Sequence, residues 1–317
     1  NSKLPYTHAM ATQQQQGLSY LEKIVLASCI DASNARVHNY HSSLILDVVL
    51  SGAVLYVLTR QGKITINDEE SEKTNNEQNE KEAQSSSANE SLSINSLIQK
   101  SKKKFEDNNI KVVGSSSAQT IIPDDENDEI IHEAFELVKS APEKSIQLWI
   151  NEFSGRTVKG KYQIKDLKKR PLHGLVNHGL AVHEKHTISS DKFPLTDEGR
   201  KQQEELFRII QEIFDAYEKS IPKGKDKDQQ EIETPKVKFN TKDLVLVAFY
   251  LMVDNHLMAF AKDQRDRIKQ GMKSLFSSSS EVHRFLSMAE NSTTFLEAEI
   301  ISAIISITYS STTDSLT

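Results

Sequence analysis

The densest run of positively charged side chains lies between residues 156 and 170. Lys165, Lys168 and Lys169 are spaced so that an α-helix would place them on one face, with Arg170 beside them. A preceding loop adds Arg156, Lys159 and Lys161. Several cations in one patch can bind a phosphorylated anion, because each contributes a charge-assisted hydrogen bond. Basic runs are also common on exposed helix faces that bind nothing, so both interpretations stay open.

The same region contains the pattern G-x-x-x-x-G-K at residues 155–161, which is found in nucleotide-binding P-loops. A P-loop follows a strand, precedes a helix and carries Ser or Thr after the Lys to hold Mg²⁺. Here the preceding residues have helical periodicity and Tyr162 follows Lys161. We therefore interpret the segment as a basic turn between two helices, with a nucleotide hydrolase as the minor alternative.

Four histidines, His173, His178, His183 and His186, lie close together in the sequence, and Asp191 follows them. They do not form H-E-x-x-H, and no Cys lies nearby to complete a zinc set, so we interpret them as surface residues. The catalytic motifs G-x-S-x-G and G-x-G-x-x-G do not occur. We predict no metal site, no cofactor and a protein that is not an enzyme.

Helical periodicity dominates the elements that would position these side chains. Ser19 and Glu22 form a capping box before the first helix, and Gly62 is placed to end the second. Pro142 is predicted near the first position of a helix that buries Trp149. Residues 63–66 alternate like a short strand, and residues 182–197 suit a hairpin or a loop. Helices are predicted over 18–30, 44–62, 130–140, 143–155, 162–182 (with an interruption at Pro171), 199–219, 241–276 and 281–310.

Composition indicates how these elements are organised. Residues 67–119 and 220–240 are low-complexity segments with too little apolar content to offset the entropy of ordering, so we predict disordered insertions there. Residues 1–16 are predicted to be a disordered lead-in and residues 311–317 a tail. The remainder, within 17–310, is predicted to be a single globular helical domain, mainly α with at most a short β-hairpin.

Charge and hydropathy exclude several classes of protein. A net charge of −6 argues against a general nucleic-acid binder. The single Cys29 excludes a disulfide framework and fits a reducing compartment. We expect no signal peptide, and the longest apolar run, residues 44–58, is shorter than the roughly 20 residues that span a bilayer. We expect a soluble or peripheral protein.

A set of short motifs in fixed order resembles the Golgi phosphoprotein 3 family of peripheral Golgi membrane proteins. The motifs cover nearly all of the predicted helical domain. They are E-A-x-x-x-V-K (133–139), W-I-x-x-x-S-G (149–155), Y-Q-[LI]-[KR]-x-[VL]-[KR]-x-R (162–170), G-L-V-x-x-G-L (174–180) and F-P-L-T (193–196). Residues 18–31, 52–64 and 244–260 are similar to the family's core helices.

The resemblance implies a helical protein that binds phosphatidylinositol 4-phosphate on the cytosolic face of the Golgi. It implies partners in the cytosolic tails of glycosyltransferases and in coatomer, with a role in retaining those enzymes and in vesicle trafficking. The phosphate ligands carry over to Lys165 and Lys168, with Arg170 beside them. A Trp and an Arg that the family also uses fall near Ser42 and Ser51 here. The alternative is a scaffold of the same fold that has lost the lipid site and works through protein–protein contacts.

Overall fold

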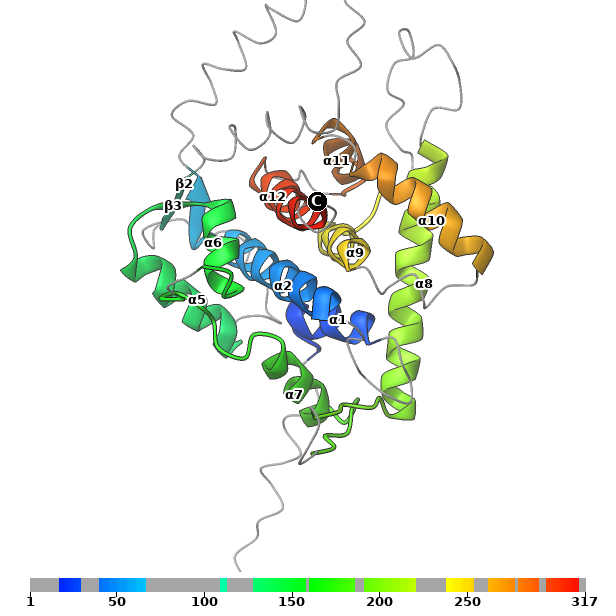
Figure 1. The fold of residues 1–317 in the computed structure, drawn as a ribbon. Helices are drawn as coiled ribbons and strands as arrows, with labels where there is room; N and C mark the ends of the chain where they lie inside the picture. The colour runs from blue at the N-terminus through cyan, green and yellow to red at the C-terminus, as the bar shows by residue number, and fades with distance from the viewer. Residues whose placement is uncertain are drawn as a thin grey trace, which may run out of the picture.

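Helix α2 (Tyr40–Arg60) runs through the centre of the molecule, and the other elements pack around it (Figure 1). The computed structural model describes residues 17–29, 40–66, 109–112, 128–157, 160–185, 191–220, 238–253, 262–276, 279–290 and 295–313. The core segment of α2 from residue 45 to 58 is almost wholly buried and, apart from Asp47 and Ser51, is made of apolar residues and Gly52, as expected for a helix with neighbours on all sides. The predicted end at Gly62 is confirmed: Gly62 has φ 65°, and Lys63 donates its N–H to the Leu58 carbonyl.

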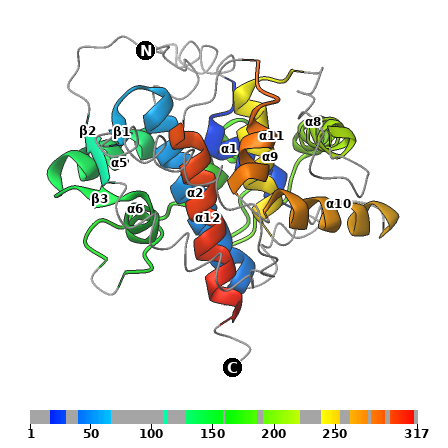
Figure 2. The same ribbon diagram turned by 90° about the horizontal axis from the view of Figure 1, so that it is seen from above.

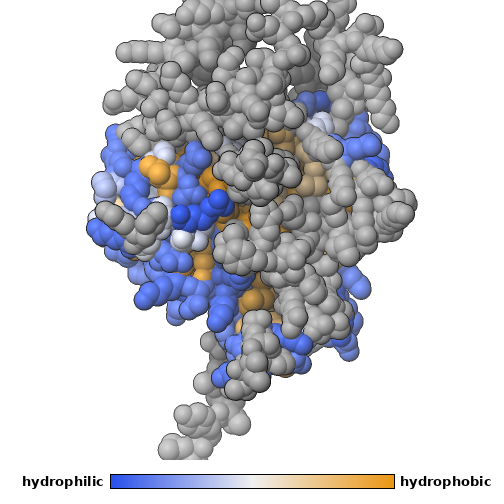
Figure 3. Space-filling view, viewed as in Figure 1, coloured by the Kyte–Doolittle hydropathy of each residue, from blue (hydrophilic) through white to orange (hydrophobic). Residues whose placement is uncertain are grey.

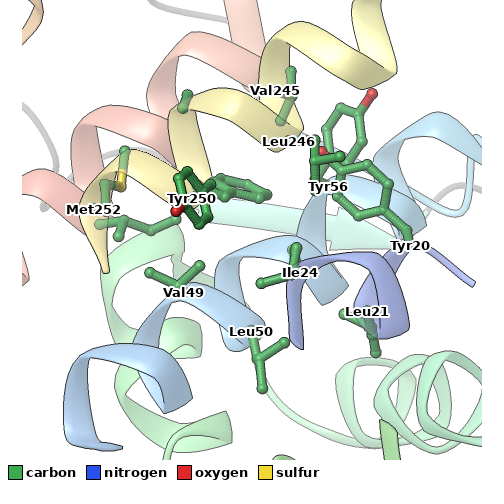
Figure 4. Packing of buried hydrophobic residues seen from close by; sticks show 14 of the residues in the cluster. Tyr20, Leu21, Ile24, Val49, Leu50, Tyr56, Val245, Leu246, Tyr250 and Met252 are labelled. Atoms are coloured by element: carbon green, nitrogen blue, oxygen red, sulfur yellow. The ribbon is translucent and has the colours of Figure 1, made fainter. Parts of the chain in front are cut away.

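The helices that pack most closely against α2 are α1 (Tyr20–Ser28), α5 (Glu129–Ser140), α6 (Ile146–Phe153), α9 (Thr241–Met252) and α12 (Phe295–Thr313). Helix α12 lies along α2 in both ribbon views (Figures 1 and 2). The capping box that starts α1 is confirmed, since Glu22 donates its N–H to Ser19 Oγ and Ser19 donates its N–H to Glu22 Oε2. Between α1, α2 and α9 the core is aromatic, with Tyr20 and Tyr56 ring centroids 5.1 Å apart (Figure 4).

Two of the long predicted helices are each divided into two. The segment 241–276 forms α9 and α10 (Lys262–Leu275), and the segment 281–310 falls into α11 (Ser279–Leu286) and α12. Every residue of α9 except Lys242 and Asp243 is buried, whereas α10 is amphipathic and packs Gly271 against Phe214. A single helix of that length would be about 54 Å long, more than a core of this size can cover. The prediction of one continuous helix over 241–276 was therefore wrong.

A small three-stranded antiparallel sheet lies beside α5 (Glu129–Ser140) and α6. Its order is β1 (Ile64–Ile66), β2 (Asn109–Val112) and β3 (Lys144–Ser145). Ile64 pairs with Val112, and Asn109 pairs with Ser145. The short strand predicted at 63–66 is confirmed, and the sheet has one strand more than the short hairpin expected.

The sheet corrects two predictions. Strand β2 lies inside residues 67–119, so residues 109–112 are not part of a disordered insertion; Ile110 is 2% exposed and its burial holds the strand in place. Pro142 does not open α6, because β3 comes between them and Ser145 caps the helix, accepting a hydrogen bond from the Leu148 N–H.

On the other side of the molecule, α7 (Lys169–Asn177) leads into α8 (Asp197–Ser220) through a hairpin. Antiparallel bridges join Ala181 to Leu195 and Glu184 to Lys192, which confirms the hairpin alternative for residues 182–197. Thr196 accepts a hydrogen bond from the Gly199 N–H at the start of α8, as the sequence indicates.

The mainly helical class is confirmed across the described residues. Most of the predicted lead-in, insertions and tail lie outside them. Three boundaries are corrected: α8 includes Ser220, residues 238–240 lead into α9, and α12 extends to Thr313. Among the described helices, none is both long and apolar enough to cross a lipid bilayer.

Candidate functional site

The basic segment has a different backbone from the one predicted. Residues 161–168 form turns, and helix α7 begins only at Lys169. Asp166 has a left-handed backbone with φ 53°. Three buried side chains anchor the turns at a spacing that no helix face provides: Tyr162, Ile164 and Leu167. Lys165, Lys168 and Lys169 therefore do not share one helical face, and that part of the prediction was wrong.

Lys168 lies at the start of α7 and faces α2. Its Nζ is 3.9 Å from Asp47 Oδ2, and both side chains are about one-quarter exposed. Burial raises the pKa of the Asp47 carboxyl above its ordinary value, and the charge of Lys168 partly offsets this. Asp47 lies within the apolar run 44–58, and no local pattern in the sequence marks it as a partner of Lys168.

Ser51 lies one helical turn after Asp47 on α2. Its hydroxyl donates a hydrogen bond to the Asp47 carbonyl oxygen at 2.7 Å, and the residue is completely buried. Ser51, one of the two positions that the resemblance compares with ligand residues, therefore has no access to an external anion. The side chain of Ser42 lies outside the described part of the structure.

Arg170 links α7 to α5. Its guanidinium donates a hydrogen bond to Glu133 and lies 3.8 Å from Glu129 Oε2. These contacts to two carboxylates fix the first turn of α7 against α5. The surface over α5 is predominantly hydrophilic, which agrees with this charged contact (Figure 3).

Lys165 and Lys169 are the open cations of the segment. Both are exposed, and neither forms an ion pair within the residues that the structure describes. The first turn of α7 also has no acidic residue and no side-chain cap. Cations at a helix N-terminus oppose the helix dipole, typically by 0.3 to about 1 kcal/mol each. A bound anion would relieve this repulsion and accept hydrogen bonds from the same groups.

The segment that matches G-x-x-x-x-G-K follows helix α6 rather than a strand. Gly155 has φ 73°, and Arg156 donates its N–H to the Asn151 carbonyl, so the loop begins as a helix C-terminal turn. Val158 and Lys159 lie outside the described residues, and Tyr162 follows in turns rather than in a helix. The backbone therefore has the form of a basic turn, as the sequence analysis favoured.

Glu152 closes this loop at its base. Its carboxylate accepts hydrogen bonds from Lys144 Nζ at 2.7 Å, from Thr157 Oγ1 at 2.9 Å and from the backbone of Tyr162. Partial burial alone would raise the pKa of the Glu152 carboxyl, but these donors hold it below its ordinary value. Both ends of the loop are thus tied to one carboxylate.

Lys144 adds a second constraint on the loop. Its ammonium lies 4.0 Å from the ring centroid of Tyr162 and 5.1 Å from that of Trp149, within the range of cation–π attraction. Trp149 is fully buried, which confirms it as a core residue. Sequence reasoning missed both Lys144 and Glu152, because they lie 8 residues apart and their contact depends on the path of β3 into α6.

Of the predicted histidine group, the structure brings His173 and His183 together, with ring centroids 4.8 Å apart. His173 and His178 are exposed, as expected. His183 is partly buried instead: its ring stacks on Phe193 with centroids 4.7 Å apart, and Nε2 lies 3.0 Å from Asp191 Oδ2. These contacts hold the two arms of the hairpin together. In the part of the chain described, no group of three or more His, Cys, Asp or Glu side chains has the geometry of a metal site, and His186 lies outside it.

The arrangement as a whole suits the binding of an anion. Exposed lysines surround the uncapped start of α7, and a braced basic loop precedes them. In comparisons with known proteins, no protein-family model matches the chain, and no curated protein matches it in sequence.

Proposed function

We propose that the protein is a non-enzymatic peripheral membrane adaptor that binds phosphatidylinositol 4-phosphate through Lys165 and Lys168. The observation that carries the proposal is the start of α7, where exposed Lys165 and Lys169 lie next to Lys168 with no acid in the first helical turn. The order of motifs shared with the Golgi phosphoprotein 3 family supports the choice of lipid. It also supports a cytosolic Golgi location, with glycosyltransferase tails and coatomer as partners.

The three predicted ligands have different tasks in this proposal. Lys165 forms no ion pair among the described residues, so it can bind phosphate without first breaking an internal ion pair. Lys168 exchanges the single carboxylate charge of Asp47 for a phosphate, which carries about −1.5 to −2 charges and more acceptor oxygens. Arg170 stays with Glu133 and positions the helix start beside the lipid headgroup.

A second candidate is favoured by a specific observation. Lys168 and Arg170 are both engaged by carboxylates of the same chain, and Ser51 on α2 is buried. A scaffold that works through protein–protein contacts, with this basic segment acting only to join α2, α5 and α7, has the same geometry. Membrane binding separates the two candidates.

The test is flotation of the purified chain with phosphatidylcholine vesicles, with and without phosphatidylinositol 4-phosphate. We expect the wild type to float only with the lipid, and Lys165→Glu combined with Lys168→Glu to abolish flotation. The matched control, Lys139→Glu with Lys219→Glu, makes the same change of charge at exposed sites on α5 and α8 and should float like the wild type.

The double variant places a new carboxylate beside Asp47, so its folding needs a check by circular dichroism. Lys165→Glu with Lys169→Glu changes two exposed lysines that form no ion pair within the described residues, and it gives the same test without that risk. Equal flotation of the wild type and both site variants would exclude the site. Failure of the wild type to bind these vesicles would favour the scaffold.

A further inference from the structure

A pocket of about 240 Å³ lies where the first turns of α1 and α9 meet, built from residues that the basic segment before α7 does not use. Leu18, Tyr20 and Leu246 are the apolar residues of the lining, but Tyr20 and Leu246 are almost fully buried, so the accessible lining is mostly polar. Figure 4 shows Tyr20 on α1 and Leu246 on the neighbouring α9. The polar part of the lining comes from both helices and consists of Lys23, Asn240, Lys242 and Asp243.

The frame of the pocket is fixed by hydrogen bonds. Tyr20 donates its hydroxyl to the backbone carbonyl of Lys242 at 3.2 Å, which ties the two helix starts together. The Asn240 side chain accepts a hydrogen bond from the Lys242 N–H at 2.9 Å and caps α9. Lys242 makes both contacts through its backbone, and its side chain forms no ion pair among the described residues.

The pocket has an excess of positive charge. Neither Lys23 nor Lys242 lies within 4.0 Å of a carboxylate in the described part of the chain. Asp243 is the only acid in the lining, so two ammonium groups face one carboxylate. Burial raises the pKa of the Asp243 carboxyl, and the charges of Lys23 and Lys242 act in the opposite direction, so both lysines lie close enough to act on it.

We propose that this pocket binds a small phosphate anion. Lys23 and Lys242, which form no ion pair among the described residues, supply charge-assisted hydrogen bonds to the phosphate. A lysine ammonium binds phosphate as a point charge, whereas a carboxylate is bound best by the planar, two-pronged guanidinium of Arg. The proposal is independent of lipid binding before α7, since the two sites share no residue.

The experiment is calorimetric titration of the full chain with phenyl phosphate, alongside inorganic phosphate, benzoate and phenol. We expect saturable binding of phenyl phosphate and of inorganic phosphate, weaker binding of benzoate, and none of phenol. Lys23→Gln and Lys242→Gln should each weaken phenyl phosphate binding on the order of tenfold, and Asp243→Asn should tighten it. Lys219→Gln, an exposed lysine on α8, is the matched control and should bind like the wild type.

A second arm identifies the source of the phosphate. Vesicles that contain phosphatidic acid present a phosphate monoester on a lipid. Vesicle binding that depends on Lys23 and Lys242 would show that the pocket takes a lipid headgroup. Binding of phenyl phosphate without vesicle binding would show that it takes a soluble molecule. The Lys165→Glu, Lys168→Glu variant should still bind phenyl phosphate. A wrong assignment of the pocket can therefore be distinguished from a wrong assignment of the site before α7. No saturable binding of phenyl phosphate or these vesicles, equal affinity for benzoate, or unchanged binding by both pocket lysine variants would overturn the proposal.

Discussion

At the residue scale, Lys165, Lys168 and Arg170 carry the same charge but are paired differently. Arg170 contacts two carboxylates of α5, Lys168 faces one on α2, and Lys165 has none among the described residues. The charge available to an external anion therefore decreases from Lys165 to Arg170. Asp47 is the residue through which this balance can be changed, because it faces Lys168.

We predict that Asp47→Asn tightens binding to vesicles containing phosphatidylinositol 4-phosphate, by up to about fivefold, because Lys168 loses its internal competitor. The pKa of Asp47 is raised in the folded chain, so its ionised form costs stability at pH values above its titration. The variant should thus be at least as stable as the wild type at neutral pH, with the difference shrinking on acidification as Asp47 is protonated.

Vesicle flotation and urea unfolding at several pH values measure the two effects. Asp197→Asn removes an exposed carboxylate, 92% accessible, from α8 and serves as the control. Vesicle binding by Asp47→Asn that matches the wild type would mean that Lys168 does not contact the lipid.

At the element scale, the start of α8 depends on close contact with the chain after α7. Gly199 lies in the first turn of α8, and a Cβ atom there would overlap the backbone carbonyl of Leu180. That carbonyl also accepts the Thr196 N–H at 2.9 Å, so it cannot move without loss of a hydrogen bond. The contact sets the position of α8 relative to the hairpin.

Gly199→Ala should destabilise the protein by about 1–3 kcal/mol, because the new methyl group overpacks against backbone. Helix propensity alone predicts the opposite sign, since Ala is favoured over Gly inside a helix by about 1 kcal/mol. Urea unfolding distinguishes destabilisation by the overlap from stabilisation by helix propensity. Gly17→Ala is the control, because nothing lies within 4 Å of a Cβ atom at that position. A more stable Gly199→Ala variant would contradict the contact.

At the scale of the whole molecule, one buried helix organises the fold, and segments far apart in the sequence complete it. Strand β2 pairs with β1 although 42 residues of low-complexity sequence separate them. Antiparallel neighbours can be joined by a short turn, so the architecture does not require the long connection.

Replacing residues 67–108 with a four-residue turn should keep the fold and raise its stability by roughly 2 kcal/mol, since a shorter loop costs less entropy to close. Circular dichroism and urea unfolding measure this, and vesicle binding should be unchanged. A shortened chain that fails to fold, or that loses vesicle binding, would show that the segment has a role beyond connecting the strands.

Local patterns in the sequence determined most of the helical framework. Ser19 with Glu22 starts α1, Gly62 follows α2, and Trp149 is buried, because capping, backbone conformation and apolar periodicity act within a few residues. The backbone of 161–168 was not predictable in this way. Its apolar anchors Tyr162, Ile164 and Leu167 follow the shape of the core rather than a helical repeat.

The tertiary structure alone decided which charges meet. Asp47 with Lys168, and Glu133 with Arg170, come from elements distant in the chain, and no spacing in the sequence encodes their contact. The pocket between α1 and α9 likewise exists only because Lys23 and Lys242, more than two hundred residues apart, start neighbouring helices. Periodicity identifies the buried face of a helix but not the partner that covers it, so the chemistry of both candidate sites depends on how the helices pack.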